Sequence, residues 1–319
     1  MALHEEMRAF LDSAPEGEVD FHDFTVAEVR TAVDGWMEVA GEGPEIAEVK
    51  DVSVPGPAGA PAIRARLYHP RPETALPLLV FMVGGGFVAN SLEVEDTPVR
   101  RIAGTADVAV LAVECRSAPE HPYPLPNDDA ATALTWALEH AAELGADPAR
   151  VGVGGHSSGG ALAVGAALRV ARTHPGRLRA LAVVTPSLGA DFDTPSYRRY
   201  AQGYALTRTN ARWFWSQYLG DRLADPPVEA TPARARQVEG LPPAVFQLAE
   251  FDVLHDEATA LADRMRDAGV PVTLSRGEGL MHGFFYMDRV SEAAAAANRA
   301  FGLATGRLLH GPDGTRPRA

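Results

Sequence analysis

Gly155-His156-Ser157-Ser158-Gly159 is the stretch that decides the predicted fold, because of the patterns on either side of it. An apolar run at 151–154 precedes it, and a helical pattern at 159–172 follows it. A serine between small residues in a sharp turn from strand to helix is typical of a catalytic nucleophile. The alternative is a glycine-rich turn that binds a nucleotide, but the chain lacks the glycine spacing of such turns. The stretch therefore predicts Ser157 as a nucleophile.

Apolar runs and helical patterns alternate on both sides of this stretch. Six short apolar runs are expected to be strands buried on both faces, at 76–83, 108–113, 151–155, 178–184, 244–249 and 270–274. Two earlier segments alternate as half-buried strands do, at 49–54 and 63–68. Helical patterns lie between most of the runs, at 97–106, 128–144, 159–172 and 256–268. We therefore expect an α/β protein with a mostly parallel eight-stranded sheet flanked by helices.

Two helical regions outside this alternation are predicted to form a cap over the site. Thr25 and Glu28 have the spacing of a capping box in a helical N-terminal arm. The apolar stripe of this arm is expected to be buried, and it consists of Phe24, Val29, Val33 and Trp36. The interval 187–235 contains no clear strand and is rich in aromatic residues, which predicts an inserted helical cap. A helix on the outer edge of the molecule is the alternative for this interval.

The chain is accordingly divided into three parts. They are a helical cap arm at 1–45, a main domain at 46–310 with the insertion at about 187–235, and a flexible tail at 311–319. No internal repeat is evident.

A glycine-rich loop, Gly84-Gly85-Gly86-Phe87, directly follows the apolar run at 76–83. Successive glycines let the backbone approach a substrate without a clash with Cβ atoms. Backbone N–H groups fixed in such a loop can stabilise the negative oxygen that develops during acyl transfer. We expect the N–H groups of Gly85 and Gly86 to act as such an oxyanion hole, with the N–H of Ser158 as a third donor. A flexible surface loop is the alternative.

An acid and a histidine follow late in the chain. Asp252 comes after the run at 244–249, and His282 comes after the run at 270–274. The order Ser157, Asp252, His282 is that of α/β-hydrolases and differs from the orders in chymotrypsin and subtilisin. His282 would take the proton of the serine, and Asp252 would orient the imidazole. His255 and Asp256 are competing candidates, and Asp252 is preferred because it lies nearest the end of its strand.

Several motifs together resemble the bacterial hormone-sensitive-lipase-like carboxylesterases of family IV, from about residue 52 to residue 286. The motifs are the glycine loop, RSAPEHPYP at 116–124, the serine turn at 155–160, GYALT at 203–207, WFW at 213–215, AEFDVLHDE at 249–257 and HGF at 282–284. The resemblance implies an α/β-hydrolase fold with a helical cap and hydrolysis of esters with small or medium acyl groups. It also implies that no metal or other cofactor is needed, and often a homodimer.

Three positions depart from the pattern of this family. Val83 stands where the family's glycine motif begins with histidine, His156 stands where an acid usually precedes the serine, and Cys115 stands where tyrosine is usual. The backbone donors of Gly85 and Gly86 do not depend on that histidine. The departures leave two alternatives open. One is a biosynthetic enzyme that uses the same site for elimination, cyclisation or acyl transfer, and the other is a ligand-binding protein without catalysis.

The walls of the predicted cleft are mainly apolar. They are expected to include Phe87, Val88, Tyr204, Trp213 and Trp215, with His156 as a possible substrate contact. This composition predicts that the substrate has an apolar acyl or aryl group.

Composition narrows the possible partners and location. The formal net charge of −13 argues against a polyanionic partner such as nucleic acid. Cys115 is the single cysteine, so an intrachain disulfide is not possible. The N-terminal sequence shows no signal-peptide pattern. The apolar runs along the chain are too short to span a bilayer. We therefore expect a cytoplasmic protein that acts on a small-molecule ester.

Overall fold

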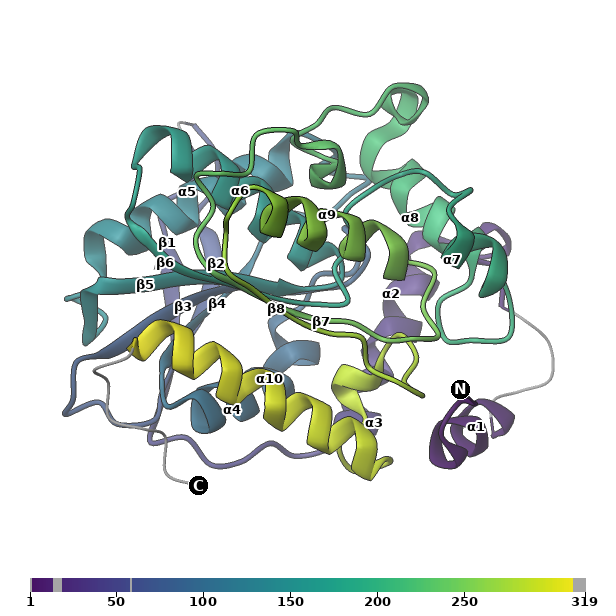
Figure 1. The fold of residues 1–319 in the computed structure, drawn as a ribbon, viewed down its shortest axis with the longest axis horizontal. Helices are drawn as coiled ribbons and strands as arrows, with labels where there is room; N and C mark the ends of the chain where they lie inside the picture. The colour runs from purple at the N-terminus through teal and green to yellow at the C-terminus, as the bar shows by residue number, and fades with distance from the viewer. Residues whose placement is uncertain (1, 14–18, 58, 312–319) are drawn as a thin grey trace.

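A twisted sheet crosses the centre of the protein, with helices on both of its faces (Figure 1). The computed structural model describes residues 2–13, 19–57 and 59–311, so nearly all of the predicted flexible tail lies outside the described residues. Within them, eight strands form one sheet in the order β1-β2-β4-β3-β5-β6-β7-β8. The strands are β1 (Glu48–Val54), β2 (Ile63–His69), β3 (Leu76–Met82), β4 (Ala109–Glu114), β5 (Ala146–His156), β6 (Leu178–Val184), β7 (Ala244–Gln247) and β8 (Val272–Ser275).

The pairing of the strands is mostly parallel. β1 pairs with β2 and β2 pairs with β4 in antiparallel register, whereas every pair from β4 through β3 to β8 is parallel. The predicted fold class is confirmed.

The two faces of the sheet bury different residues of the same strand, as the alternation of side chains requires. Leu78, Val80 and Met82 of β3 face one core, and Leu79 and Phe81 face the other. The first core lies beneath α5 (Leu125–His140), α6 (Ser158–Thr173) and α9 (His255–Asp267), and the second lies beneath α4 (Leu92–Ala106) and α10 (Glu292–His310). The central strands are therefore buried on both faces, as their apolar runs predict.

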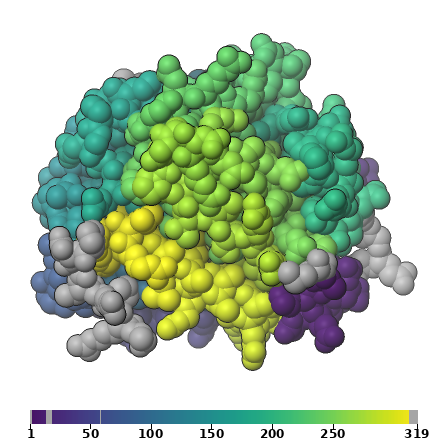
Figure 2. Space-filling model, viewed as in Figure 1, coloured from purple at the N-terminus to yellow at the C-terminus, as the bar shows by residue number. Residues whose placement is uncertain are grey.

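The remaining helices gather mainly at one end of the sheet (Figure 1). They are α1 (Glu5–Asp12), α2 (Val26–Asp34), α3 (Trp36–Ala40), α7 (Pro195–Arg199) and α8 (Arg208–Leu219), with short 3-10 turns η1 (Phe21–Asp23), η2 (Gly220–Ala224), η3 (Pro232–Arg234) and η4 (Phe284–Tyr286). Figure 2 shows α1, in purple, at the surface beside C-terminal segments, where the backbone N–H of His4 donates to the carbonyl of Gly279 over 3.0 Å. The predicted capping box of Thr25 and Glu28 is present at the start of α2.

Three local predictions need correction. Phe24 is exposed because it precedes the N-cap of α2, so it does not join the buried stripe of Val29. The last strand, β8, is only partly buried, because it is an edge strand paired with β7 alone. The helix predicted from 97 begins at Leu92, where the side chain of Ser91 accepts a hydrogen bond from the backbone N–H of Val94. This earlier start places Glu95 in the first turn of α4.

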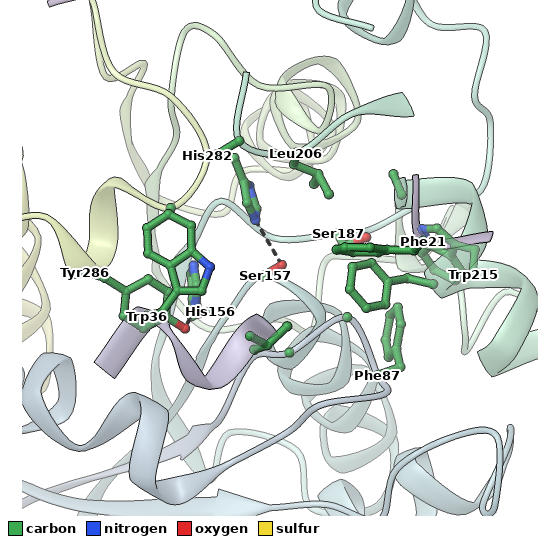
Figure 3. Close-up of a pocket in the computed structure, with 17 residues that line it drawn as sticks. Phe21, Trp36, Phe87, His156, Ser157, Ser187, Leu206, Trp215, His282 and Tyr286 are labelled. Carbon is green, nitrogen blue, oxygen red and sulfur yellow. Dashed lines mark hydrogen bonds between the residues drawn. The ribbon is translucent and has the colours of Figure 1, made fainter. Parts of the chain in front are cut away.

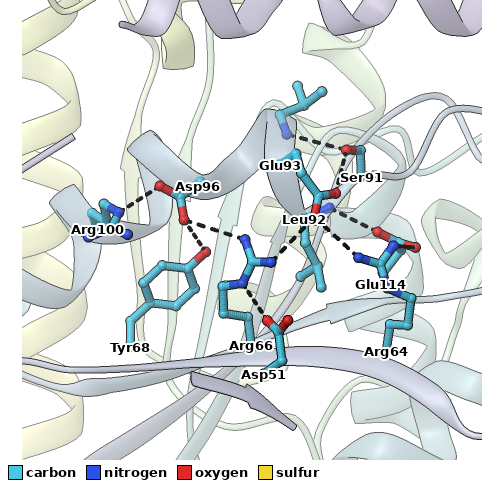
Figure 4. Close-up of polar contacts among 11 residues, drawn as sticks. Asp51, Arg64, Arg66, Tyr68, Ser91, Leu92, Glu93, Asp96, Arg100 and Glu114 are labelled. Atoms are coloured by element: carbon cyan, nitrogen blue, oxygen red, sulfur yellow. Dashed lines mark hydrogen bonds and ion pairs between the residues drawn. The ribbon is translucent and has the colours of Figure 1, made fainter. Parts of the chain in front are cut away.

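An ion-pair network ties β1 and β2 to α4 at the antiparallel end of the sheet (Figure 4). Arg66 of β2 donates to Asp51 of β1 over 2.6 Å and to Glu93 of α4 over 3.3 Å. Its neighbour on the same face, Arg64, donates to Glu114 of β4 over 2.7 Å. The network is partly exposed, so each pair is expected to contribute only modestly to stability.

Candidate active site

Ser157 lies in a strained turn between β5 and α6. Its φ of 53° and ψ of −119° lie in a region that residues with side chains rarely adopt. The turn also brings the start of α6 against β3, where a Cβ on Gly159 would lie 2.1 Å from the carbonyl oxygen of Met82. The backbone N–H of Ser157 donates to the carbonyl of Val184 over 3.0 Å. The small residues around the serine are therefore needed for the turn itself.

The structure brings Ser157, His282 and Asp252 together. Ser157 Oγ lies 3.3 Å from His282 Nε2, and His282 Nδ1 lies 2.8 Å from Asp252 Oδ2. Figure 3 shows the imidazole directly above the serine hydroxyl. Asp252 is 2% exposed, and its other carboxylate oxygen accepts the backbone N–H of Leu254 over 3.0 Å. A bridge between Phe251 and Met281 joins the two loops that carry the acid and the histidine.

The competing candidates have other partners. His255 Nδ1 lies 2.8 Å from the carbonyl oxygen of Ala249. Asp256 accepts a hydrogen bond from the backbone N–H of Ser196 over 2.7 Å. Both residues belong to the first turn of α9, and both support loops near the site.

The glycine loop lines the same pocket as Ser157 and His282. Gly85 and Gly86 have φ angles of 128° and 64°, and both residues line the pocket in front of Ser157. The carbonyl oxygen of Gly85 accepts the backbone N–H groups of Val88 and Ala89, which closes a tight turn. Ser158 occupies the first position of α6, directly after the serine. The role of these three N–H groups as an oxyanion hole stays a prediction.

The pocket in front of Ser157 is largely aromatic. It holds about 760 Å³ of empty space, part of which is open to solvent. The side chains labelled in Figure 3 that surround the serine and the histidine are Phe21, Trp36, Phe87, His156, Ser187, Leu206, Trp215 and Tyr286. Of the predicted wall residues, Phe87, His156 and Trp215 line this pocket.

Three predicted wall residues lie elsewhere. Val88 is fully buried in the core beneath the glycine loop. Tyr204 packs edge-to-face against Tyr200, at a centroid distance of 5.5 Å. Trp213 is turned away from the pocket and packs against Phe21 at 5.7 Å. Successive residues of a helix point about 100° apart, so the aromatic run of α8 cannot present all of its members to one cavity.

The chain contributes pocket residues that sequence patterns did not identify. Phe21, Trp36, Leu206, Phe214 and Tyr286 come from segments far apart in the sequence, and only the fold brings them together. Phe214 lies close enough to Gly86 that a Cβ there would meet its ring at 2.3 Å. The aromatic content of the interval 187–235 was a signal for Phe214, and it did not distinguish between the faces of the helix.

Burial raises the pKa of three ionisable groups near the site. Burial raises the pKa of the Cys115 thiol well above its ordinary value, so this cysteine is a poor second nucleophile. Burial also raises the pKa of Glu257 well above its ordinary value, although Glu257 accepts the backbone N–H of Leu188 over 2.6 Å. Burial likewise raises the pKa of the Tyr286 hydroxyl.

Two further findings concern the described part of the chain. No helix there combines the length and apolar character that crossing a membrane requires. No group of three or more histidine, cysteine, aspartate or glutamate side chains is arranged there to hold a metal ion.

Comparison with known proteins places this geometry in a family. A sequence model described as the α/β hydrolase fold matches residues 79–286. The chain belongs to this α/β-hydrolase family. Its relatives include the carboxylic ester hydrolase LipN of Mycobacterium tuberculosis, which is 40% identical over 80% of this chain and 69% of its own length. An ethyl acetate hydrolase of Pseudomonas putida is 33% identical over 92% of this chain and 95% of its own.

Solved structures of esterases are also similar over nearly all of this chain. A thermostable esterase from Pseudomonas putida has a TM-score of 0.91 and 30% identity, and the match covers 97% of this chain and 98% of that one. The predicted membership among the hormone-sensitive-lipase-like carboxylesterases is confirmed, and so is the prediction of an enzyme of the carboxylic ester hydrolase class.

Proposed function

We propose that this α/β-hydrolase family member is a serine carboxylesterase that acts on esters with small to medium acyl or aryl groups. The observation that carries the proposal is the contact of 3.3 Å between Ser157 Oγ and His282 Nε2, together with the contact of 2.8 Å between His282 Nδ1 and Asp252. A nucleophile, a base and a group that orients the base are the set that acyl transfer through serine requires.

The proposed reaction has two halves. His282 Nε2 takes the proton of Ser157 as its oxygen attacks the ester carbonyl, and the N–H groups of Gly85, Gly86 and Ser158 stabilise the resulting oxyanion. The imidazolium then protonates the leaving alcohol, and an acyl-enzyme remains. In the second half, His282 activates a water that releases the acid and regenerates the serine. Asp252 holds the Nδ1–H of the imidazole and stabilises its cation throughout.

The pocket supports an apolar substrate of limited size. Phe21, Trp36, Phe214 and Trp215 offer aromatic surface, and Leu206 and Phe87 extend it. Such walls favour an alkyl or aryl group over a charged one. One relative is named an ethyl acetate hydrolase, which agrees with a short ester. A homodimer, a cytoplasmic location and a cap role for 1–45 and 187–235 are part of the proposal.

Labelling of Ser157 tests the proposal directly. A fluorophosphonate probe should label the wild-type chain once, at Ser157, and the chain should hydrolyse p-nitrophenyl acetate and butyrate. Ser157→Ala should abolish labelling and lower kcat by at least about 10³-fold. Ser275→Ala, at an exposed position of β8, serves as the matched control and should match the wild type.

Other outcomes of this experiment favour the alternatives. A chain that takes no label and hydrolyses no ester would be a binding protein. A chain that takes the label at Ser157 and leaves every ester intact would use the site for elimination, cyclisation or transfer. Full turnover by Ser157→Ala would exclude the serine mechanism.

A further inference from the structure

Glu95 is a fully buried carboxylate that the proposed reaction does not use. Its Oε1 atom accepts the backbone N–H of Gly84 over 3.2 Å and the hydroxyl of Tyr286 over 2.8 Å. His156 Nδ1 lies 2.8 Å from the same oxygen. A carboxylate oxygen can only accept, so Nδ1 is assigned as the protonated nitrogen of His156. One oxygen atom of α4 is therefore bonded to three separate segments of the chain.

Each of these three segments carries a different part of the proposed machinery. Gly84 opens the loop that contains the two predicted oxyanion donors. His156 immediately precedes Ser157, and its ring stacks 5.9 Å from that of His282. Tyr286 follows His282 by four residues, in η4. Figure 3 shows His156 and Tyr286 side by side next to Ser157, with the ring of His282 above the serine.

The fit around Oε1 is close. A Cβ on Gly84 would lie 2.8 Å from His156 Nδ1 and 3.0 Å from Glu95 Oε1, so the loop has no free space beside the cluster. Among the described residues, Glu95 Oε2 and His156 Nε2 have no hydrogen-bond partner. Tyr286 Oη also lies 3.3 Å from His156 Nδ1. The N–H of Gly84 and the hydroxyl of Tyr286 both donate to Oε1, and loss of this acceptor would leave these buried donors unsatisfied.

The sequence departures at this site are complementary. Val83, directly before the glycine loop, is apolar and buried, so its side chain offers the loop no hydrogen bond. An acid at position 156 would stand beside Glu95, and two buried carboxylates at such a distance would repel each other. A histidine there pairs with Glu95 instead. The cluster supplies the polar support for the loop that Val83 does not.

We propose that Glu95, with His156 and Tyr286, is a positioning group that holds the glycine loop, the serine turn and the histidine loop in their catalytic arrangement. Glu95 acts through these segments and does not contact the reacting atoms. The inference rests on the proposed esterase function. It implies that Glu95 matters more to the transition state than to substrate binding, because a slight displacement of oxyanion donors weakens mainly the bonds made to the developing charge.

Two variants separate positioning from a general role in folding. Glu95→Gln keeps the size of the side chain and an acceptor oxygen but removes the charge, and Tyr286→Phe removes one donor and keeps the ring. Glu95→Gln should lower kcat for p-nitrophenyl butyrate by about 10–100-fold, with KM changed by less than about threefold. Tyr286→Phe should lower kcat by about 3–10-fold. The inhibition constant of an alkyl trifluoromethyl ketone, which forms an oxyanion adduct with the serine, should rise in parallel with the loss of kcat/KM.

Tyr68→Phe is the matched control. Tyr68 donates to Asp96, the neighbour of Glu95 on α4, also over 2.8 Å, but it lies on β2 away from the pocket. This variant should change thermal stability as Tyr286→Phe does and leave kcat and the inhibition constant unchanged. If Glu95→Gln does not fold, Tyr286→Phe with this control decides the question.

The outcomes distinguish the inference from the function on which it rests. Wild-type kcat and inhibition in Glu95→Gln, or in Tyr286→Phe where it alone folds, would overturn the positioning role. So would a loss of kcat in Tyr68→Phe equal to that in Tyr286→Phe, since the effect would then follow stability alone. A wild-type chain that neither hydrolyses the ester nor binds the ketone would instead overturn the proposed function.

Discussion

Two aspartates four residues apart, Asp252 and Asp256, show how the fold distinguishes residues that look alike in the sequence. Asp252 is buried in the loop between β7 and α9 and directs one carboxylate oxygen to His282. Asp256 lies on α9 and binds the backbone at Ser196. Both carboxylates are satisfied, but only the first has the imidazole as its partner.

This difference predicts unequal effects of the same substitution. Asp252→Asn should lower kcat by about 10⁴-fold, because an amide can stabilise neither the correct tautomer of His282 nor its cation. Asp256→Asn should keep kcat within about threefold, since its amide oxygen can still accept the backbone N–H. Initial rates with saturating p-nitrophenyl butyrate measure both. Equal losses in the two variants would contradict the assignment of Asp252.

At the scale of elements, helix α2 is joined to the glycine loop through Arg30. Its Nε donates to the carbonyl of Val88 over 2.9 Å, and its Nη2 donates to the carbonyl of Ala118 over 3.1 Å. The same guanidinium binds Glu120 in a bidentate manner. The hydrogen bond from Arg30 lowers the pKa of Glu120 to about 2. The N-terminal arm thus has a charged anchor next to the site.

The lowered pKa gives this anchor a defined pH dependence. A carboxyl with a depressed folded-state pKa stabilises the fold fully above its ordinary value, and that contribution is lost as pH falls through the folded-state pKa. Glu120→Gln should lower the free energy of unfolding at pH 6 by less than about 1 kcal/mol, because the pair is exposed. The difference from the wild type should shrink as the pH falls from about 4.5 to about 2, the range between the ordinary and the folded-state pKa of Glu120. Urea unfolding at several pH values measures it, and a constant difference would contradict the pairing.

The elements that the sequence predicts well are those whose neighbours leave a repeating trace. The central strands are buried by helices on both faces, so continuous apolar runs mark β3 through β7. An edge leaves no such trace, and the short run at 270–274 did not distinguish β8 from an interior strand. The predicted helix from 97 missed the first turn of α4, which begins after the N-cap Ser91 and continues through Pro98.

The residues of the candidate site also divide into those that a sequence pattern marks and those that it does not. Ser157, Asp252 and His282 could be predicted because the carboxyl ends of parallel strands meet at one edge of the sheet. Glu95, Trp36 and the pocket role of Tyr286 could not, because each acts through a partner that is close only in the folded chain. Trp213 and Trp215 show what aromatic content alone cannot predict, since the rotation of the helix decides which of them faces the pocket.

At the scale of the whole molecule, the site combines a rigid floor with a less deeply buried cover. The glycine loop follows β3, which is buried throughout, and Ser157 follows the buried C-terminal half of β5. Phe21, Val33 and Trp36 of the N-terminal arm line the same pocket and are only partly buried. Trp36 is held by stacking on Phe10 at 5.8 Å and on Tyr286 at 5.3 Å. Segments with few buried contacts open at a lower free energy than the core.

Because the cover of the pocket is less deeply buried than its floor, we predict that urea abolishes activity before it unfolds the sheet. In urea, hydrolysis of p-nitrophenyl butyrate should decline at a lower concentration than the far-ultraviolet circular dichroism, because the arm detaches while the sheet persists. Activity is to be assayed at the urea concentration in which the protein was equilibrated, because dilution of the urea would let the arm refold. The circular dichroism is measured at the same concentrations. Trp36→Ala should widen the gap between the two midpoints, since it removes the stacking of the arm on Tyr286. Coincident midpoints in the wild type and in the variant would mean that the arm and the sheet unfold as one cooperative unit, and that the cover of the pocket is as stable as its floor.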